Sequence, residues 1–531
     1  MLQCPRWLSY PVLTAFSLIV LAPILFLVIS PFWHEGHISW LYLQELILSS
    51  RQLNLLKTSI LLAGTATCLT LLLGLPYALL IERTDLPGRS LLGLAYLIPL
   101  LIPPYMQAIV WDYLLSKGGW IAELLTFFIG RPFVVSPFWA AVLSLSLAYY
   151  PFVTLLTISG LRGIDSSYEE AGILHRGMWS SLSRITIPLA APHIISGAVF
   201  VFIFSIIDFG VPDIFRLRVY PVEIFIQFSG LYDEKAAVVL AFPLLLLMAG
   251  LVLIQVWYMK GRSYVGLGNG RRGSRCFSLG RARFPAVAFP FFVLCLSVFI
   301  PVLSLVRTTG TWTVLRDVLV SSWSEIAYSF AMAFAGALIM TVFAFFIAYI
   351  MERSPPRYRS VLEYMTQLPF AIPAILLGVA LIKLWNHPVT AWLYGSSFMV
   401  IMGYVAHFVP FSIRATLSSL KQINPHLEEI GHLVSHNWLR TAGRILVPLT
   451  RTGLLTAFFI GFILSLGDLG ITLLIIPPGM STIPIKIYNF MHYGAEAKVA
   501  ALSLTLLGIQ LVLVTGLLTL YHKTTPSYER P

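Results

Sequence analysis

The chain has 531 residues, of which 58% are hydrophobic and only 11% are charged. A soluble protein of this length could not bury so much apolar surface, so the composition excludes a soluble globular fold and indicates a protein embedded in lipid. The net charge of +12 does not by itself indicate nucleic-acid binding, because membrane proteins collect Lys and Arg on their cytoplasmic loops.

The N-terminal region has one Arg followed by an uncharged run, 11–33, which is longer than the core of a signal peptide. We therefore expect a retained first transmembrane helix. Further runs long enough to cross about 30 Å of hydrocarbon recur along the chain. They predict an all-α polytopic membrane protein with twelve spans, at 11–32, 58–81, 91–112, 138–160, 190–212, 237–258, 285–306, 326–350, 362–383, 397–418, 452–476 and 499–521.

The distribution of basic residues predicts the orientation of these spans. If the N-terminus lies inside, the inner loops and tails hold most of the 35 Lys and Arg residues, and the segment 260–284 alone holds seven basic residues and no acid. This bias predicts that both termini are cytoplasmic. The same Gly-rich segment is typical of a flexible linker, since it has no periodic pattern and lacks the GK[ST] ending of a phosphate-binding loop. We therefore expect this chain to bind no nucleotide cofactor.

The two halves of the chain share residues at constant offsets, which indicates an internal duplication. At an offset of 270, Glu82-Arg83, Pro99 and Pro103 recur as Glu352-Arg353, Pro369 and Pro373. At an offset of 260, Glu169, Arg184, Ile185, Pro188, Leu189, Ser205, Asp208 and Gly210 recur as Glu429, Arg444, Ile445, Pro448, Leu449, Ser465, Asp468 and Gly470. The change of offset predicts that the second half lacks ten residues, which we place in an outer loop. Six spans per repeat predict two parallel repeats with a pathway between them.

Two polar segments, here called the first island (168–192) and the second island (425–450), interrupt the apolar pattern at matching places in the repeats. Each carries acids where a first helical turn favours them and a proline, Pro188 or Pro448, before the next span. We expect each island to be a short surface helix that the proline separates from that span, with an exposed face for a partner. Because the island is duplicated, the partner is expected to be two-fold symmetric.

The islands resemble the EAA loop of ABC importer permeases. The matching residues are Glu169, Glu170, Ala171, Ile185 and Pro188 in the first island and Glu429, Gly431, Ile445 and Pro448 in the second. Glu428 precedes the second match, while Gly172, Gly177 and Gly431 lie near the glycine position of the motif, at which this sequence has His175 and Ser435. One chain with two fused six-span units is similar to the ferric-iron importer permeases, and permeases for thiamine and aminoethylphosphonate are relatives.

The resemblance implies a type I ABC importer permease fold in the bacterial inner membrane. It also implies a homodimeric ATPase that carries ATP and magnesium and docks on both islands, and an external solute-binding protein that delivers the substrate. The domains expected from it are an N-terminal helix and outer loop at 1–56, a first permease domain at 57–258, the basic linker at 259–284, a seventh helix and outer loop at 285–325, a second permease domain at 326–521 and a tail at 522–531.

Four residues inside the spans are candidates for the translocation pathway: Asp208, Asp468, Pro103 and Pro373. A symmetric pair of carboxylates would suit a hard cation, but each Asp could equally cap or break a helix at the outer boundary. The prolines could break helices beside a cavity or serve packing alone. Glu82-Arg83 and Glu352-Arg353 are interpreted as interfacial anchors. His432 and His436 lie four apart without a third ligand, so no metal site is predicted.

The sequence thus predicts a transport permease, not an enzyme, and the expected substrate is ferric iron. Thiamine, aminoethylphosphonate or a polyamine are alternative substrates. A rival from another class is an ion-coupled secondary transporter, which also uses twelve spans in two repeats. That rival would require titratable residues near the middle of the membrane, and the sequence offers few besides the two aspartates.

Overall fold

The computed structural model of the chain describes residues 5–34, 37–38, 49–132, 134–259, 277–435 and 437–524. Most of these residues are helical, and the strands are limited to the antiparallel pair β1 (Trp33–His34) and β2 (His37–Ile38). Within the described residues, nine helices are long and apolar enough to cross a membrane, and there are up to twelve spans if each of three bent helix pairs counts as one. The predicted all-α class and number of spans are confirmed.

Contacts divide the chain into two compact units. One unit comprises Leu46–Glu223 and Pro243–Thr308, and the other comprises Met1–Glu45, Ile224–Phe242 and Thr309–Pro531. The first repeat is therefore grouped with the helix of the seventh span, and the second repeat with the N-terminal helix. The domain boundaries predicted from the sequence follow chain order and do not contain this grouping. It arises from packing between residues far apart in sequence.

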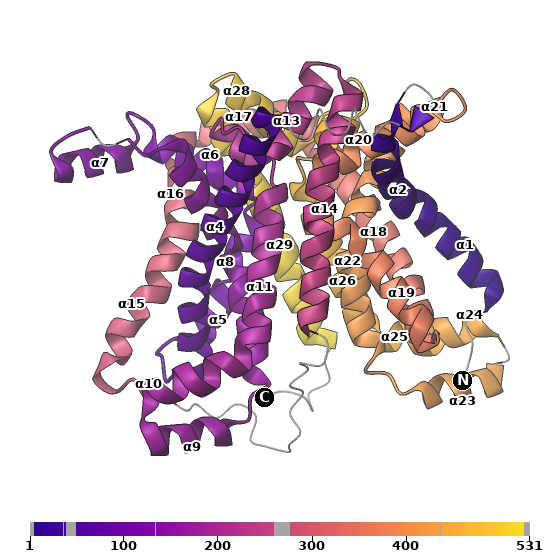
Figure 1. Cartoon of the computed structure of the whole chain (residues 1–531), viewed down its shortest axis with the longest axis horizontal. Helices are drawn as coiled ribbons and strands as arrows, with labels where there is room; N and C mark the ends of the chain where they lie inside the picture. Colours follow the sequence, from indigo (N-terminus) through magenta and orange to yellow (C-terminus); the bar gives the residue numbers. More distant parts are fainter. Residues whose placement is uncertain are drawn as a thin grey trace. The chain divides into compact units, whose positions relative to one another are not determined.

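The unit of the first repeat is built around α4, α8 and α11, which pack against one another (Figure 1). Gly74 on α4 makes this close approach, since a Cβ there would lie 3.0 Å from the Tyr150 carbonyl oxygen on α8. Small residues at helix crossings let membrane helices pack closely. The helices are α4 (Ser50–Arg83), α5 (Arg89–Ala95), α6 (Pro104–Leu115), α7 (Trp120–Ile129), α8 (Pro137–Arg162), α9 (Ser166–Arg176), α10 (Met178–Ser181), α11 (Ile187–Ile207), α12 (Gly210–Ile214), α15 (Arg283–Leu294) and α16 (Ile300–Thr309).

The unit of the second repeat has the same arrangement around α18, α22 and α26. The N-terminal helices α1 (Arg6–Phe16) and α2 (Ala22–Ile29) pack on α18 and α20 of this unit. The remaining helices are α17 (Trp312–Ser321), α18 (Trp323–Arg353), α19 (Pro356–Gln367), α20 (Ala374–Trp385), α21 (Ala391–Tyr394), α22 (Ser397–Leu420), α23 (Pro425–Ser435), α24 (Trp438–Thr441), α25 (Val447–Leu449), α26 (Arg451–Gly467), α27 (Thr472–Ile475), α28 (Ile483–His492) and α29 (Glu496–Thr524). The division of the chain into units falls within α13 (Tyr220–Phe225) and α14 (Glu234–Met259), so each of these helices contributes residues to both units.

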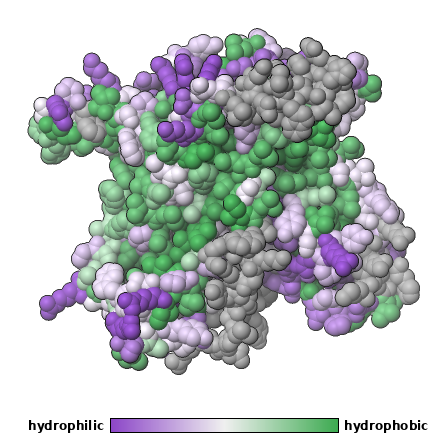
Figure 2. Space-filling model, viewed as in Figure 1, coloured by the Kyte–Doolittle hydropathy of each residue, from purple (hydrophilic) through white to green (hydrophobic). Residues whose placement is uncertain are grey.

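The surface over the first repeat has the polarity of a membrane protein. Figure 2 shows hydrophobic residues along the helices of this repeat, at the left of the view, and hydrophilic residues gathered at their two ends. Large apolar side chains such as Leu72 on α4 and Phe292 on α15 are exposed in the chain itself. Such a surface is stable only against lipid.

The third and ninth spans are broken at matching prolines. Helices α5 and α6 meet at 89°, and α19 and α20 meet at 103°. Pro103 and Pro373 are the N-caps of α6 and α20, and the residue before each, Ile102 or Ile372, is extended. A proline disfavours the helical conformation of the residue before it, which explains both breaks.

The other two matched prolines do not act as the sequence predicted. Pro188 lies inside a helix that is continuous from Met178 to Ile207, so it does not separate the first island from the next span. A π turn, Leu182–Thr186, ends two residues before Pro188, and another, Ala442–Leu446, ends two residues before Pro448. The wider π turn lets a proline follow without interrupting the helix. The break of the second repeat comes later, at Thr450, where the helices bend by 76°.

The missing ten residues are found in one connection. The first repeat has 116–136 between α6 and α8, whereas the second has 386–396 between α20 and α22. The longer connection contains α7, and the shorter one contains only the single turn of α21. This connection enters α8 at its N-terminal end, and α9 follows its C-terminal end. The connection therefore lies on the far side from the islands, as the sequence predicted.

Candidate functional site

The first island folds as a helix, a sharp turn and a second helix. Helix α9 begins after Asp165, whose Oδ1 accepts a hydrogen bond from the Ser167 N–H at 3.0 Å. It ends at Gly177, which has φ 82° and ψ 171°, a conformation open essentially only to glycine. The predicted surface helix is therefore present, and Gly177 rather than Pro188 separates it from the following span.

A buried ion pair ties α9 to the end of α4. Arg83 Nε lies 3.1 Å from Glu169 Oε1, and both side chains are almost completely buried. The Thr186 hydroxyl donates to the same Oε1 at 2.8 Å, and Arg83 also donates to the Leu161 carbonyl at the end of α8. A buried carboxylate is tolerated only when it is paired and hydrogen-bonded, and Glu169 meets both conditions.

The second island has the same anchor with different supporting groups. Glu428 on α23 is buried; its Oε2 accepts a hydrogen bond from Arg353 Nε at 2.8 Å and forms an ion pair with Arg353 Nη2 at 2.7 Å. The Tyr349 hydroxyl donates to Glu428 Oε1 and accepts a hydrogen bond from Trp438 Nε1 at 2.8 Å. The pair therefore joins α23 to the end of α18, as Glu169 and Arg83 join α9 to α4.

These anchors correct two interpretations of the sequence. Arg83 and Arg353 are not interfacial anchors that reach toward water, because each is paired with the buried glutamate of its island. The counterpart of Glu169 is Glu428, not Glu429, which is exposed and bonded to His426 at 3.0 Å. A constant offset of 260 placed Glu429 in that position, and identity alone could not show which of two adjacent acids is buried.

The glycines confirm the corrected register. A Cβ on Gly172 would lie 2.5 Å from Ile185 Cδ1, and a Cβ on Gly431 would lie 2.5 Å from Ile445 Cδ1. Gly172 and Gly431 thus occupy equivalent positions, three residues after the buried glutamates. The second island has one more residue between Gly431 and Thr441 than the first has between Gly172 and Ser181, so the offset changes from 259 to 260 inside the island.

Both islands leave an apolar face exposed. Leu174 is 89% exposed and Leu433 is 75% exposed. The other large exposed apolar side chains of the islands are Tyr168, Trp179, Leu427, Ile430, Leu439, Val447 and Leu449. Ala171, Glu170, Pro188 and Pro448 are exposed as well, whereas Ile185 and Ile445 are half-buried against the glycines. Exposed apolar residues in contiguous groups mark interaction surfaces.

The two intramembrane aspartates lie at helix breaks, but their surroundings differ. Asp208 ends α11; its Oδ1 accepts from the Val211 N–H at 2.8 Å, and its Oδ2 accepts from the Tyr149 hydroxyl at 3.1 Å. Asp468 ends α26, and its Oδ2 accepts from the Thr472 N–H at 3.0 Å and from the Thr472 hydroxyl at 2.5 Å. Each carboxylate therefore has the capping geometry that the sequence offered as one alternative.

The two aspartates differ in exposure and in the elements that they reach. Asp468 is 8% exposed and has its hydrogen bonds within its own segment, whereas Asp208 is half-buried and reaches across to α8. Within the described residues no three His, Cys, Asp or Glu side chains gather as a metal site. His436 and the side chain of His432 lie outside the part of the chain that the structure describes.

Comparison with known proteins places the fold in a family. Residues 344–523 match the family described as the binding-protein-dependent transport system inner membrane component. The chain is 30% identical over 167 residues to the molybdenum transport system permease protein of Escherichia coli, which is 72% of that relative and 31% of this chain. The chain belongs to this family. It is the permease of an ABC importer, and the predicted type I importer fold is confirmed.

Two further relatives match both repeats of this permease. The Fe(3+)-transport system permease protein of Haemophilus influenzae is 23% identical over 493 residues, which is 89% of this chain and 90% of the relative. The ferric transport system permease protein of Actinobacillus pleuropneumoniae is 22% identical over 480 residues, which is 86% of this chain and 70% of the relative. The two-repeat organisation is thus shared along almost the whole length.

Proposed function

We propose that this permease imports ferric iron, delivered by a solute-binding protein on the outer side of the bacterial inner membrane. The observation that carries the proposal is the match of both repeats, over 89% of the chain, to a permease named for Fe(3+) transport. A putative 2-aminoethylphosphonate permease of Salmonella typhimurium matches only 37% of the chain. The fused arrangement therefore favours ferric iron over aminoethylphosphonate.

The islands are the docking sites for the ATPase in this proposal. Their exposed apolar faces around Leu174 and Leu433 offer two similar surfaces, which suit a homodimeric ATPase that carries ATP and magnesium. The permease is not an enzyme in this scheme. ATP-driven closure of the two ATPase subunits would draw α9 and α23 together. The buried pairs of Glu169 with Arg83 and Glu428 with Arg353 would carry that motion into α4 and α18.

The orientation follows from the same proposal. An ATPase binds nucleotide in the cytoplasm, so the islands and both termini face inward, in agreement with the basic character of the inner loops. The connection that contains α7 then lies on the outer side, because it enters α8 at the end opposite to α9.

For the pathway we propose Asp208 rather than Asp468 as the carboxylate that meets the cation. Tyr149 and Asp208 place a phenol and a carboxylate oxygen 3.1 Å apart, and both side chains are half-buried. Oxygen donors of this kind suit a hard trivalent cation. Asp208→Asn and Tyr149→Phe are expected to lower ferric uptake while the complex with the ATPase still assembles. Asp468→Asn is expected to lower stability, because Asp468 bonds only within its own segment.

The substrate is tested with the complete transporter in proteoliposomes. The permease, its ATPase and its binding protein are assembled, ATP is enclosed with the ATPase side inward, and uptake of radioactive ferric iron is compared with uptake of 2-aminoethylphosphonate and molybdate. We expect ATP-dependent uptake of ferric iron alone. Uptake of another solute with no ferric uptake would overturn the substrate but not the family.

A further inference from the structure

Helix α7 has no counterpart in the second repeat. It occupies the connection 116–136, which is ten residues longer than its equivalent 386–396. Helix α7 packs on α6, with Ala122 buried in the contact, and it ends at Gly130 with φ 72°. Figure 1 shows α7 projecting sideways from one end of the repeat, whereas α4 and α8 run along it. The segment is therefore a folded helix, not an extended loop.

The face of α7 that does not pack on α6 is apolar. Phe127 is 81% exposed, Phe128 is 75% exposed, and Leu124 is about half exposed. The spacing of Leu124, Phe127 and Phe128 places all three on one side of the helix. The only acid of α7 is Glu123, at the edge of that face. Exposure of two adjacent phenylalanines to water is unfavourable.

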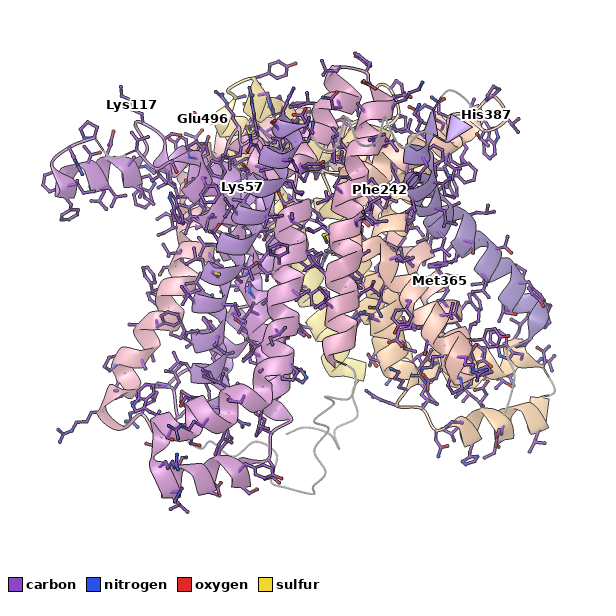
Figure 3. All side chains as sticks on the ribbon, in the orientation of Figure 1. Lys57, Lys117, Phe242, Met365, His387 and Glu496 are labelled. Carbon is purple, nitrogen blue, oxygen red and sulfur yellow. The ribbon has the colours of Figure 1, made fainter. Side chains whose placement is uncertain are left out.

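Basic and aromatic residues flank this face at the level where the spans end. Lys117 precedes α7, Arg131 follows it, and both are exposed. Figure 3 labels Lys117 beside the start of α7. Trp139, in the first turn of α8, is 59% exposed. Trp and Tyr residues are enriched at the boundary between bilayer and water in membrane proteins.

We propose that α7 lies in the lipid–water boundary, with Leu124, Phe127 and Phe128 among the acyl chains and Lys117 and Arg131 beside anionic headgroups. A helix with one apolar face and flanking basic residues binds in this way, parallel to the membrane plane. The lipid–water boundary lies near the ends of the membrane spans. Because α7 connects the end of α6 to the start of α8, it lies near that boundary. The apolar face of α7 thus continues the lipid-facing surface of α8 at Trp139.

The basic residues favour lipid over a docked protein as the occupant. Two positive charges lie at the two ends of the helix, where headgroup phosphates would meet them while the apolar face enters the acyl region. Within the described residues, the equivalent connection of the second repeat holds only the four-residue α21, so this anchor belongs to the first repeat; that it lies at the outer surface rests on the proposed function.

Photo-crosslinking in nanodiscs tests the proposal on the full transporter. Benzoylphenylalanine replaces Phe127 or Phe128 in nanodiscs that contain phosphatidylglycerol and phosphatidylcholine, and Tyr493, an exposed aromatic in a turn, is the control position. We expect lipid adducts at Phe127 and Phe128, by mass spectrometry, several-fold above those at Tyr493. Adducts with the binding protein, or lipid adducts no more frequent than at Tyr493, would overturn the proposal.

A second measurement tests the charges. In the Lys117→Gln, Arg131→Gln variant we expect the share of phosphatidylglycerol among the adducts at Phe128 to fall several-fold toward its share in the nanodisc. An unchanged share would contradict the assignment of these two residues to anionic headgroups. Variants that elute with the wild-type complex in size-exclusion chromatography are compared, so that misfolding is detected separately.

Discussion

The two islands hold their buried glutamates by the same ion pair but with different neighbours. In the first island the hydroxyl of Thr186, in the π turn before α11, donates a hydrogen bond to Glu169. In the second, Tyr349 and Trp438 form a chain of hydrogen bonds to Glu428. The Glu–Arg pair is thus the common element of the anchor, while the neutral donors have diverged between the repeats.

The divergence makes one anchor more enclosed than the other. Arg83 is 1% exposed, whereas Arg353 is 11% exposed and closer to water. A charge that loses its partner in a more enclosed site is less stabilised by solvent. The same change should therefore cost more in the first island than in the second, which leads to predictions of decreasing size.

The largest effect is expected for Glu169→Ala. This change leaves Arg83 buried without a counter-charge, and breaking a buried pair costs about 3–5 kcal/mol. We expect faster amide exchange throughout α9 and loss of ATP-dependent uptake. Glu170→Ala, at the exposed neighbour, is the control and should leave the amide exchange of α9 unchanged. Equal effects at the two positions would show that Glu169 is not the anchor.

The counterpart in the second island, Glu428→Ala, should have the same effect on α23 but a smaller one, since Arg353 is partly reached by water. Glu429→Ala is the matched control. The comparison also checks the register, because a larger effect from Glu429→Ala than from Glu428→Ala would restore the sequence-based alignment. Exchange rates of α23 amides in nanodiscs provide the measurement.

A smaller effect is expected for Tyr349→Phe, which removes the hydroxyl between Trp438 and Glu428 and keeps the ion pair with Arg353. The buried Glu428 Oε1 and Trp438 Nε1 would each lose the hydrogen bond to this hydroxyl, and leaving a buried polar group unsatisfied costs about 1–3 kcal/mol. Amide exchange in α23 and α24 should rise, while α9 is unaffected. Tyr328→Phe on the same helix, where the hydroxyl bonds to Ser397 at 3.0 Å, serves as the control. No change in α23 would mean that Tyr349 does not support the anchor.

The tight glycines should give an effect of about the same size that can be partly reversed. Gly172→Ala brings a methyl group to 2.5 Å from Ile185 Cδ1 and 2.7 Å from Ser181 Oγ, and overpacking of this kind costs about 1–3 kcal/mol. Because Ile185→Val removes the first of these two contacts, the double variant should regain part of the lost thermal stability. Gly443→Ala, which meets nothing within 4 Å, is the control. A double variant no more stable than Gly172→Ala would exclude this contact as the cause.

The smallest effect concerns a contact in the first repeat only. Asp85 Oδ1 accepts a hydrogen bond from the Leu279 N–H at 2.8 Å, and this bond lowers the pKa of the Asp85 carboxyl from its ordinary value. A lowered pKa means that the contact is fully present above about pH 4, the pKa of a free Asp, and weakens as the pH falls below that value. Amide exchange of residues 277–283, corrected for its intrinsic pH dependence, should rise there, and Asp85→Asn should abolish the pH response. A response that persists in Asp85→Asn would assign it to another group.

The features that were predicted from sequence depend on local patterns. Apolar runs located the spans, and Pro103 and Pro373 lie at the breaks of the third and ninth spans. The change of offset anticipated that the connection containing α7 is ten residues longer than its equivalent. The paired acids Glu169-Glu170 and Glu428-Glu429 predicted the short helices of the islands. Each of these features is determined by residues close together in the chain.

The features that were not predicted depend on contacts across the fold. The partner of Glu169 is 86 residues away, at Arg83, and only packing shows that both are buried. The recurrence of Glu-Arg at the ends of matching spans, together with recurring acids in the islands, was the available signal. Pro188 was expected to end a helix, since a π turn cannot be recognised from sequence, and the grouping of the N-terminal helix with the second repeat has no local signature.

In the proposed transporter, both islands are anchored by buried glutamates and dock the ATPase through their apolar faces. This docking is tested with a photo-crosslinker at Leu174 and, separately, at Leu433 in the assembled transporter, with Glu170 and Glu429 as neighbouring positions. We expect ATPase adducts from both leucines, at yields that change when ATP is bound. Both leucines remaining free of ATPase during ATP-dependent uptake would contradict this docking.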